Sequence, residues 1–280
     1  MKSAALLTSA FADEPEISDF PGARAFIRRR LRLMAFRYEH DGFCPCCETR
    51  QIFAADSDWF RDSLVCPNCG SVVRERALAL ILREILPDWR NRAIHESSPA
   101  QRGLSARMPR EAPGYVATHF FPGEPLGAVV RGFRNENLES QTFESDTFDL
   151  VLTLDVMEHV FDPAKVYAEI WRTLKPGGRY LHTFPIRKHL TEACTPLAKL
   201  MPDGTVKHLT ERPEYHGNPI DVKGSLVTLE RIARHPRLRP GYFQSDRPMG
   251  AVRPLHLAVW DETHGAIGEY TEVVVCRKRG

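Results

Sequence analysis

The stretch that decides the fold runs from residue 137 to residue 185 and reads NLESQTFESDTFDLVLTLDVMEHVFDPAKVYAEIWRTLKPGGRYLHTFP. Its segment Phe148–Leu154 is a short, largely apolar run that predicts a buried strand. Residues 163–174 (PAKVYAEIWRTL) predict a helix that is closed by the turn at 175–178, and residues 179–184 predict another strand. Strand, helix and strand at this spacing predict a parallel βαβ unit, so we expect a doubly wound α/β sheet.

The flanking sequence continues this alternation. Residues 72–86 (VVRERALALILREIL) carry apolar side chains at helical spacing and predict a helix. Residues 93–94 and 115–117 have the composition of strands. Near the C-terminus, two apolar runs flank a glycine-containing connection and predict an antiparallel hairpin, namely His256–Trp260 and Glu269–Cys276. The α/β pattern therefore extends over most of the chain.

Composition excludes several classes of protein. The 280 residues include 38 Lys and Arg against 36 Asp and Glu, and 42% of them are hydrophobic, which is ordinary for a globular protein. A formal net charge of +2 creates no field that would point to nucleic acid or an anionic membrane. No apolar run approaches the roughly 18 residues needed to cross a bilayer, and the one near the N-terminus is too short for a secretory signal. We expect a cytoplasmic protein without membrane insertion.

The first part of the chain differs in composition from the rest. Residues 1–22 are small, acidic and contain Pro and Gly, so we expect a disordered leader. Residues 23–39 (ARAFIRRRLRLMAFRYE) predict an amphipathic basic helix. This helix either contacts phosphate or an acidic surface, or packs on the protein with a solvated arginine face, and we favour the second reading.

Five of the seven cysteines lie between residues 44 and 69. Cys44 and Cys47 form one pair with two intervening residues, and Cys66 and Cys69 form another, which is the spacing of a tetrahedral zinc site with four thiolates. Cys46 could replace Cys44, but Cys44 keeps the proper spacing to Cys47. Paired disulfides are the less favoured alternative in a cytosolic chain. Four protein ligands leave no position for water, so we expect a structural zinc ribbon.

Residues 137–185 resemble the class I S-adenosylmethionine-dependent methyltransferases. In that family a turn before the central strand receives the adenine, and Asn137, Leu138 and Glu139 occupy it here. Asn137 stands where the family usually has Asp, and its side-chain oxygen can still accept a hydrogen bond. The segment Asp155–Val160 matches the family's loop beside the methyl-transfer site, and Leu174–Gly178 matches the turn before the next strand.

The resemblance implies a Rossmann-like, mostly parallel seven-stranded sheet with S-adenosylmethionine as cofactor, next to a small N-terminal zinc ribbon. We therefore expect three parts: the leader 1–22, the basic helix with the ribbon in 23–72, and the methyltransferase domain in 73–280. Within the last part, a C-terminal elaboration begins at about residue 186.

The first strand-to-helix turn departs from the family. Glu96 stands where an acidic residue belongs, but Ser98, Ala100 and Arg102 fall where glycines let the backbone approach the cofactor. After the next strand, His119 stands near the place of a carboxylate that would hold the ribose. The resemblance assigns these cofactor-binding residues: Glu96, Ser97, Ser98, His119, Asn137, Leu138, Asp155 and Val156. Either the cofactor is held by unusual contacts, which we favour, or the domain is a binding scaffold that has lost it.

Three side chains are our candidates for catalysis. A hydroxyl acceptor must lose a proton as it attacks, so a base or an equivalent group is needed. Glu158 and His159 follow the central strand, although such residues more often cap a helix or pack beside the cofactor. His216 lies in the segment EYHGNPID (214–221), which resembles a branch of these enzymes that carries a cysteine ribbon. Its setting of Gly and Asn predicts a shaped functional loop.

We favour transfer of a methyl group to a hydroxyl or amine of a small molecule or sugar. A second hypothesis is an RNA base methyltransferase, supported by the ribbon and by the arginines between residues 24 and 37. A third is a non-catalytic binding module. A small-molecule or glycan acceptor is thus the expected partner, and nucleic acid is the less favoured one.

Overall fold

The computed structural model describes residues 38–56, 60–183, 196–216, 225–229, 243–245 and 273–278. The chain divides into two units, Met1–Arg37 and Tyr38–Gly280, and all described residues belong to the second. The expected leader and most of the expected basic helix therefore lie outside the described residues. Its last two positions, 38 and 39, are not helical, because strand β1 (Tyr38–Cys44) begins there.

The main sheet confirms the predicted α/β architecture. Its strands are β3 (Ile94–Ser97), β4 (Tyr115–His119), β5 (Val129–Val130), β6 (Phe133–Asn135), β7 (Phe148–Leu154), β8 (Leu174–Thr183), β13 (Phe243–Ser245) and β14 (Val274–Lys278). Their order across the sheet is β13-β14-β8-β7-β3-β4-β6-β5. The pairs β3–β4, β3–β7, β7–β8 and β4–β6 are parallel. Among the described residues the sheet has eight strands instead of the expected seven, since the two-residue β5 adds a short edge.

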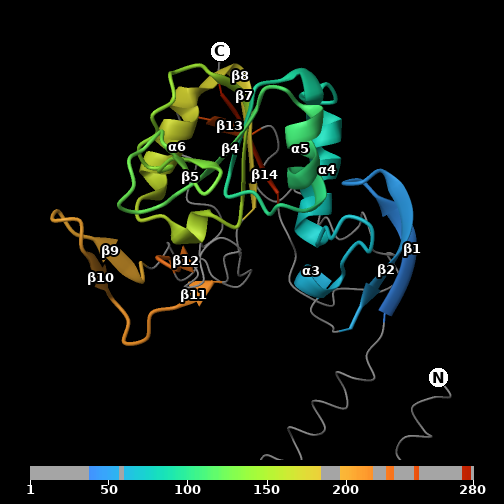
Figure 1. The fold of residues 1–280 in the computed structure, drawn as a ribbon, viewed down its shortest axis with the longest axis horizontal. Helices are drawn as coiled ribbons and strands as arrows, with labels where there is room; N and C mark the ends of the chain where they lie inside the picture. Colours follow the sequence, from blue (N-terminus) through green and yellow to red (C-terminus); the bar gives the residue numbers. More distant parts are fainter. Residues whose placement is uncertain are drawn as a thin grey trace, which may run out of the picture. The chain divides into compact units, whose positions relative to one another are not determined.

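Helices cover both faces of the sheet (Figure 1). Helix α6 (Pro163–Thr173) lies on one side, while α4 (Val73–Ile85) and α5 (Gly103–Glu111) lie on the other. The start of α6 is encoded locally, because Asp162 Oδ1 accepts a hydrogen bond from the Ala164 amide at 3.0 Å and Pro163 occupies the first turn. Two short 3₁₀ helices, η1 (Trp89–Asn91) and η2 (Met157–His159), complete this layer.

The core between α6 and the sheet is apolar. Val151, Val166, Ile170 and Tyr180 have no exposed surface, and they pack in one cluster with residues of β7, β8 and α6. Burial of an aliphatic or aromatic side chain of this size contributes roughly 1.5–3 kcal/mol. This cluster fixes β7 and β8 against α6, so the loop that follows β7 begins from a rigid strand.

Two details of the sheet differ from the expectation. The residues expected as a turn at 175–178 lie within β8, where the register with β7 shifts between Phe148 and Leu150 and Gly177 has a φ of 78°. At the C-terminus, β14 pairs antiparallel with β8 on one side and with β13 on the other. The antiparallel C-terminal pair is therefore present with residues 243–245 as one strand, while the expected strand at 256–260 lies outside the described residues.

The cysteine-rich part extends from β1 to the second cysteine pair and the residues just after it, and we call this part the cysteine hairpin. Strands β1 and β2 (Thr49–Ala55) pair antiparallel, and a short helix, α3 (Phe60–Ser63), precedes the second cysteine pair. Two further hairpins follow the sheet, β9 (Ala198–Leu200) with β10 (Val206–His208) and β11 (Tyr215–His216) with β12 (Ser225–Leu226). Within the part of the chain that the structure describes, no helix has the length and apolar character to span a membrane.

Candidate functional site

The candidate cofactor residues meet at one edge of the sheet. From β3 the chain proceeds through β4 to β6 on one side and returns to β7 and β8 on the other, so the strand order reverses between β3 and β7. Ligands of such sheets bind at the carboxyl ends of the strands beside this switch point. Ser97 ends β3, His119 ends β4 and Asp155 directly follows β7. Three elements thus present predicted site residues along one line.

The turn after β3 has positive φ angles of the kind that glycine adopts easily, although other residues occupy these positions. Ser98 has a φ of 54° and Gln101 a φ of 57°, in the left-handed region that glycine enters at the lowest cost. The Ser98 amide donates a 2.8 Å hydrogen bond to the Thr118 carbonyl of β4, which holds the turn against the next strand. The first expected glycine position therefore keeps its conformation with a small polar side chain.

The glycine that remains in this segment, Gly103, contacts the cysteine hairpin. Its amide donates to the Cys69 carbonyl at 2.9 Å, and its φ is 55°. A β-carbon there would lie 2.9 Å from the Ser71 β-carbon, closer than packed carbons approach. Nearby, Arg107 donates to the Cys46 carbonyl and Arg102 pairs with Glu75 at 2.9 Å. The cysteine hairpin and the candidate cofactor turn are therefore joined.

Glu96 lies beneath the turn. Its carboxylate is 1% exposed and accepts hydrogen bonds from Ser105 Oγ of α5 at 2.6 Å and from the Tyr115 hydroxyl of β4 at 2.7 Å. Burial raises the pKa of Glu96 from 4.5 to about 7, against the opposing effect of these two donors. These contacts position β3, α5 and β4 relative to one another. Direct contact of Glu96 with a cofactor stays a prediction.

The expected adenine turn is tightly organised. Asn137 Oδ1 accepts a hydrogen bond from the Glu139 amide at 2.9 Å, and Glu139 Oε1 accepts one from the Phe161 amide at 2.7 Å. Leu138 between them is buried in the core. The turn is thus connected to the loop before α6, and the Asn137 oxygen already stabilises the turn itself. Because an amide oxygen has two lone pairs, the same Asn137 oxygen can also accept a hydrogen bond from a ligand.

His119 sits in an aromatic setting at the end of β4. Its ring lies 5.2 Å from the ring of Phe121 and 6.0 Å from the ring of Phe133, centroid to centroid, and the side chain is buried. The loop after β4 is held by Asn135, whose amide donates to the Glu124 carbonyl at 2.9 Å and accepts from the Phe121 amide at 2.8 Å. An aromatic wall therefore stands where a carboxylate was expected from the family.

Asp155 links the end of β7 to the cysteine-rich part. It has a φ of 51°, accepts from the Thr183 hydroxyl at 3.0 Å, and pairs with Arg74 Nε of α4 at 2.9 Å. Arg74 also pairs with Asp62 of α3. Val156 follows as the half-buried residue that precedes η2. The sequence gave no signal for Arg74, because its partner lies 81 positions away in the chain (155 − 74).

The structure brings the three candidate catalytic residues together. Glu158 and His159 lie on η2, His216 lies on β11, and one ligand atom from each falls within 4.8 Å of the others. Glu158 Oε1 is 3.9 Å from His159 Nε2 and 3.8 Å from His216 Nδ1. The two imidazole rings meet edge-on with centroids 5.2 Å apart. We call Glu158, His159 and His216 the Glu–His–His cluster.

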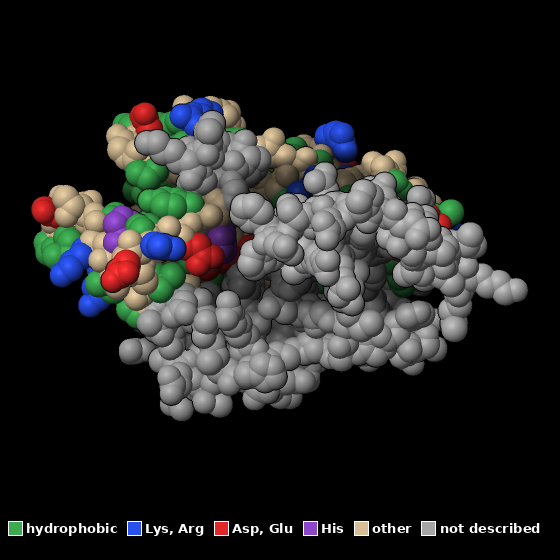
Figure 2. Space-filling model, turned by 90° about the horizontal axis from the view of Figure 1, so that it is seen from below, with side chains coloured by type: hydrophobic (Ala, Val, Ile, Leu, Met, Phe, Trp, Pro, Cys, Tyr) green, Lys and Arg blue, Asp and Glu red, His purple; other side chains and the backbone are tan. Residues whose placement is uncertain are grey.

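Exposure differs sharply across this cluster. The Glu158 side chain is 5% exposed, that of His159 18% and that of His216 41%, so the cluster opens to solvent on the His216 side. Burial lowers the pKa of His159, although the hydrogen bond to the Leu226 carbonyl opposes this. On the face shown in Figure 2, histidine and acidic side chains lie next to one another among hydrophobic and basic ones.

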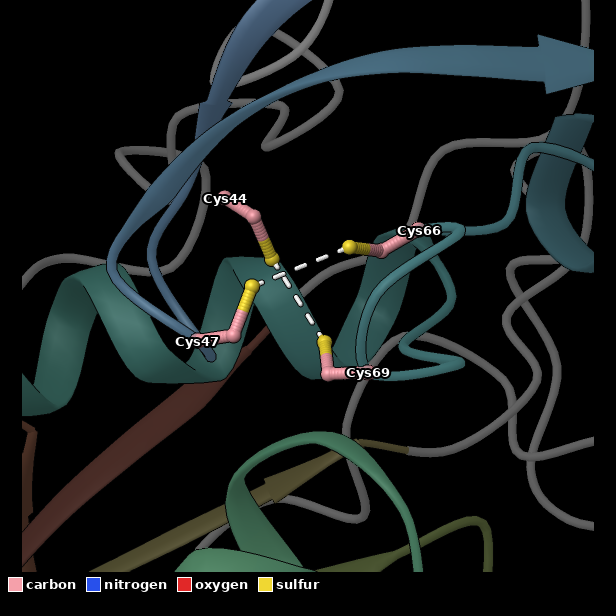
Figure 3. Close-up of side chains that lie close together, drawn as sticks. All are labelled: Cys44, Cys47, Cys66 and Cys69. Carbon is pink, nitrogen blue, oxygen red and sulfur yellow. Dashed lines mark hydrogen bonds between the residues drawn. The ribbon is translucent and has the colours of Figure 1, made fainter.

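The four predicted zinc ligands also converge (Figure 3). The sulfurs of Cys44 and Cys69 are 3.7 Å apart, those of Cys47 and Cys66 are 3.8 Å apart, and all four lie within 4.8 Å of one another. Four sulfurs each about 2.3 Å from one zinc ion would be about 3.8 Å apart. The sulfur of Cys46 is not part of this group, which agrees with the preference for Cys44.

A family comparison bears directly on this edge of the sheet. Residues 116–182 match the family model described as a methyltransferase domain, which covers the chain from β4 through β8. This range includes His119, Asn137, Asp155 and the η2 residues of the Glu–His–His cluster. Residues 116–182 are thus similar to a methyltransferase domain. The cofactor of this class of enzymes is S-adenosylmethionine, and the family match does not specify the acceptor.

The methyltransferase domain also resembles solved structures. An S-adenosylmethionine-dependent methyltransferase from Mesorhizobium loti is 17% identical, with 72% of this chain and 98% of that chain covered and a TM-score of 0.40. The PH0226 protein from Pyrococcus horikoshii is 16% identical, with 74% and 90% covered and a TM-score of 0.43. The chain spans 50% of the YcgJ protein from Bacillus subtilis, which is 20% identical over 39% of this chain with a TM-score of 0.30. Because these scores are below 0.5, the assignment rests on the family match and the sheet topology. Among curated protein sequences, none matches significantly.

Several of the described residues gave no sequence signal of their structural importance. Thr228 is one of them: its amide and its hydroxyl both donate to the Glu158 carbonyl, at 2.9 and 3.0 Å. It thereby fixes the segment 225–229 over η2 and the Glu–His–His cluster. Arg74 and Asn135, described above, are others. Each acts through a partner distant in the chain, so no local pattern could have indicated it.

Proposed function

We propose that the methyltransferase domain transfers the methyl group of S-adenosylmethionine to a hydroxyl or an amine of a small molecule or sugar. The observation that carries this proposal is the convergence of the Glu–His–His cluster beside the end of β7. Polar side chains at this place can hold an acceptor and assist the loss of its proton. Residues 23–37 of the expected basic helix, which supports the RNA hypothesis, lie outside the described residues.

On this proposal, residues at the ends of β3, β4 and β7 would hold the cofactor. The backbone at Ser97 and Ser98 would bind its methionine part, His119 its ribose, and Asn137 with Leu138 its adenine. Asp155 and Val156 would contact the region of the sulfonium. Glu96 acts beneath them, because its hydrogen bonds to Ser105 and Tyr115 hold β3 in place.

In methyl transfer, the bonds that form and break lie in the cofactor and the acceptor and not in the protein. The acceptor oxygen or nitrogen attacks the methyl carbon as the carbon–sulfur bond breaks, so the positive charge of the sulfonium is neutralised. Catalysis then depends chiefly on holding the acceptor in line and excluding water. A hydroxyl acceptor also gives up its proton, and Glu158, His159 and His216 are the groups that we propose to assist this step.

We also propose that Cys44, Cys47, Cys66 and Cys69 hold a structural zinc ion. The support is the set of sulfur distances, which fits one tetrahedral ion, and the closed ligand count. The ion would replace the apolar core that so short a hairpin cannot form. Through Gly103 it would also steady the turn after β3.

Calorimetric titration with S-adenosylhomocysteine tests the proposed function. We expect the full chain to bind, and Asn137→Ala to weaken binding several-fold because one acceptor oxygen for the adenine is lost. Asn91→Ala, an exposed position before β3, is the matched control and should bind like the parent. Absence of binding in the parent would favour the scaffold hypothesis, and unchanged binding in Asn137→Ala would move the adenine elsewhere. Radiolabelled methyl transfer to sugars and small alcohols, compared with RNA, then separates the acceptor classes.

A further inference from the structure

The distances within the Glu–His–His cluster are those of ion pairs and are too long for hydrogen bonds. Glu158 Oε1 lies 3.9 Å from His159 Nε2 and 3.8 Å from His216 Nδ1, both beyond hydrogen-bond distance. Two ligand atoms that share one metal ion at about 2.1 Å each are roughly 3–4 Å apart. The three atoms thus surround a common point at a separation that suits a bound cation better than a hydrogen bond.

The far nitrogen of each imidazole has a polar partner that orients the ring. His159 Nδ1 lies 2.9 Å from the Leu226 carbonyl, which can only accept, so Nδ1 carries the proton and Nε2 turns its lone pair towards Glu158. His216 Nε2 lies 3.4 Å from Glu214 Oε1, so its Nδ1 is the nitrogen that faces Glu158. A carbonyl or carboxylate on the far nitrogen is the usual arrangement around metal-binding histidines, because it fixes the tautomer and the ring orientation.

The backbone around the cluster is rigidly held. Thr228 donates twice to the Glu158 carbonyl, and the Leu229 amide donates to the same oxygen at 3.3 Å. The ligands come from two elements, η2 and β11, that these contacts bring together. A site whose parts are fixed in advance requires little reorganisation when an ion binds.

We propose that Glu158, His159 and His216 bind one divalent first-row transition-metal ion. Two imidazoles and one carboxylate are a ligand set that such ions accept, and three protein ligands leave coordination positions open. The open side is that of the half-exposed His216, from which an acceptor reaches the cluster. This site differs in kind from the four-cysteine cluster, whose ligand count is complete.

The metal site deepens the proposed function and rests on it for the identity of the acceptor. An oxygen ligand bound to the ion loses its proton more readily, as metal-bound water does. The acceptor is therefore a hydroxyl compound, and a vicinal diol or catechol that could occupy two open positions is the favoured class. In the reaction the O–H bond breaks, its proton passes to solvent, and the oxygen takes the methyl group from the sulfonium.

Manganese binding tests the proposal without any need for methyl transfer. We would titrate the full chain, prepared with one equivalent of zinc for the four cysteines, with Mn²⁺ and follow free Mn²⁺ by electron paramagnetic resonance, because thiolates select zinc and leave Mn²⁺ to nitrogen and oxygen ligands. We expect one Mn²⁺ per chain and at least tenfold weaker binding in His216→Ala and in Glu158→Gln. His208→Ala in the exposed strand β10 is the matched control and should bind like the parent.

Pulsed resonance on the parent chain provides a measurement that no variant's folding can disturb. Nitrogen couplings from two imidazoles are expected in the Mn²⁺ complex. Absence of Mn²⁺ binding, binding without imidazole couplings, or unchanged affinity in both variants would each overturn the metal site. The two proposals fail separately: methyl transfer that proceeds in the presence of a chelator overturns only the metal site, and metal binding without any cofactor binding overturns only the proposed function.

Discussion

The four-cysteine cluster and the Glu–His–His cluster gather ligand atoms at similar distances but in different ways. The sulfurs of the first are 3.7–3.8 Å apart and come from two short loops within 26 residues of chain (44 to 69). The second joins neighbours on η2 to a residue 57 positions later (216 − 159). The first offers four candidate ligand atoms and the second offers three. On our proposals, the number of ligands and the exposure of the site distinguish a structural ion from one that takes part in the reaction.

The cysteine-rich part contacts both the turn after β3 and the residue that follows β7. The cysteine hairpin holds Gly103 by the Cys69 carbonyl, and Arg74, at the start of α4 behind the second cysteine pair, reaches Asp155 beside η2. A structural ion in the cysteine hairpin would thus stabilise the turn after β3, which has other residues at the expected glycine positions. The comparison predicts that damage to the first cluster weakens the second region, whereas damage to the second leaves the first intact.

The largest expected effect is that of Cys66→Ser. Loss of one thiolate should release zinc, and structural zinc in small domains contributes on the order of 10 kcal/mol of apparent binding energy. We expect loss of bound zinc by elemental analysis, a lower melting temperature and weaker binding of S-adenosylhomocysteine. Cys46→Ser is the matched control, since its buried sulfur lies outside the ligand group and zinc should remain. A zinc-free Cys66→Ser chain that melts like the parent would refute the structural role.

The next effect concerns Glu96, which lies beneath the turn after β3. Burial raises the pKa of Glu96 from 4.5 to about 7, so the folded chain holds a proton that the unfolded chain releases. The free energy of unfolding should therefore be highest below about pH 4.5 and fall as the pH rises towards 7, by up to about 3 kcal/mol at 1.36 kcal/mol per pKa unit.

Urea unfolding of the parent and of Glu96→Gln between pH 5 and pH 8 measures this effect. The variant should lose this part of the pH dependence, because glutamine carries no charge in the buried site. Glu124→Gln, an exposed position in the loop after β4, is the control and should follow the parent. An identical pH profile for Glu96→Gln and the parent would contradict the burial argument.

The smallest effect is that of Gly103→Ala, which tests the connection itself. The added methyl group meets the Ser71 β-carbon at 2.9 Å in a backbone conformation that alanine disfavours, so we expect a loss of about 2 kcal/mol of stability. Gly123→Ala shares a positive φ of 87° but has nothing within 4 Å, so it reports the backbone cost alone. Equal losses in the two variants would show that the contact with the hairpin contributes nothing.

Much of this architecture could be predicted from the sequence, because the patterns that indicate it involve neighbouring residues. The bounds of β7 agree with the expected strand, and α6 begins at Pro163, where the expected helix began. The cysteine pairs were readable for the same reason, since their spacing specifies two tight loops. By contrast, α5 was not predicted, because Pro109 interrupts a short segment that contains few apolar residues. The partner of β14 was not predicted either, since residues 243–245 lie in a stretch with weak strand signals.

The sequence indicated which residues belong to the candidate site, but it did not indicate that they lie together. Glu158, His159 and His216 were each single candidates in the sequence, and only the fold shows that they share one place. Glu96 was expected to face the cofactor, yet the structure shows its hydrogen bonds to Ser105 and Tyr115. Such contacts depend on how α5 and β4 pack around a strand, which the residues of the strand alone do not encode.

The sequence by itself determined the alternation of strands and helices, the spacing of the four clustered cysteines and the similarity to a methyltransferase domain, because periodicity, spacing and turn residues act over a few neighbouring positions. Only the tertiary structure decided that His216 meets Glu158, that Gly103 serves the cysteine hairpin and that Arg74 reaches Asp155. These contacts join residues that chain folding, and not chain order, brings together, and their geometry arises from the packing of whole elements against one sheet.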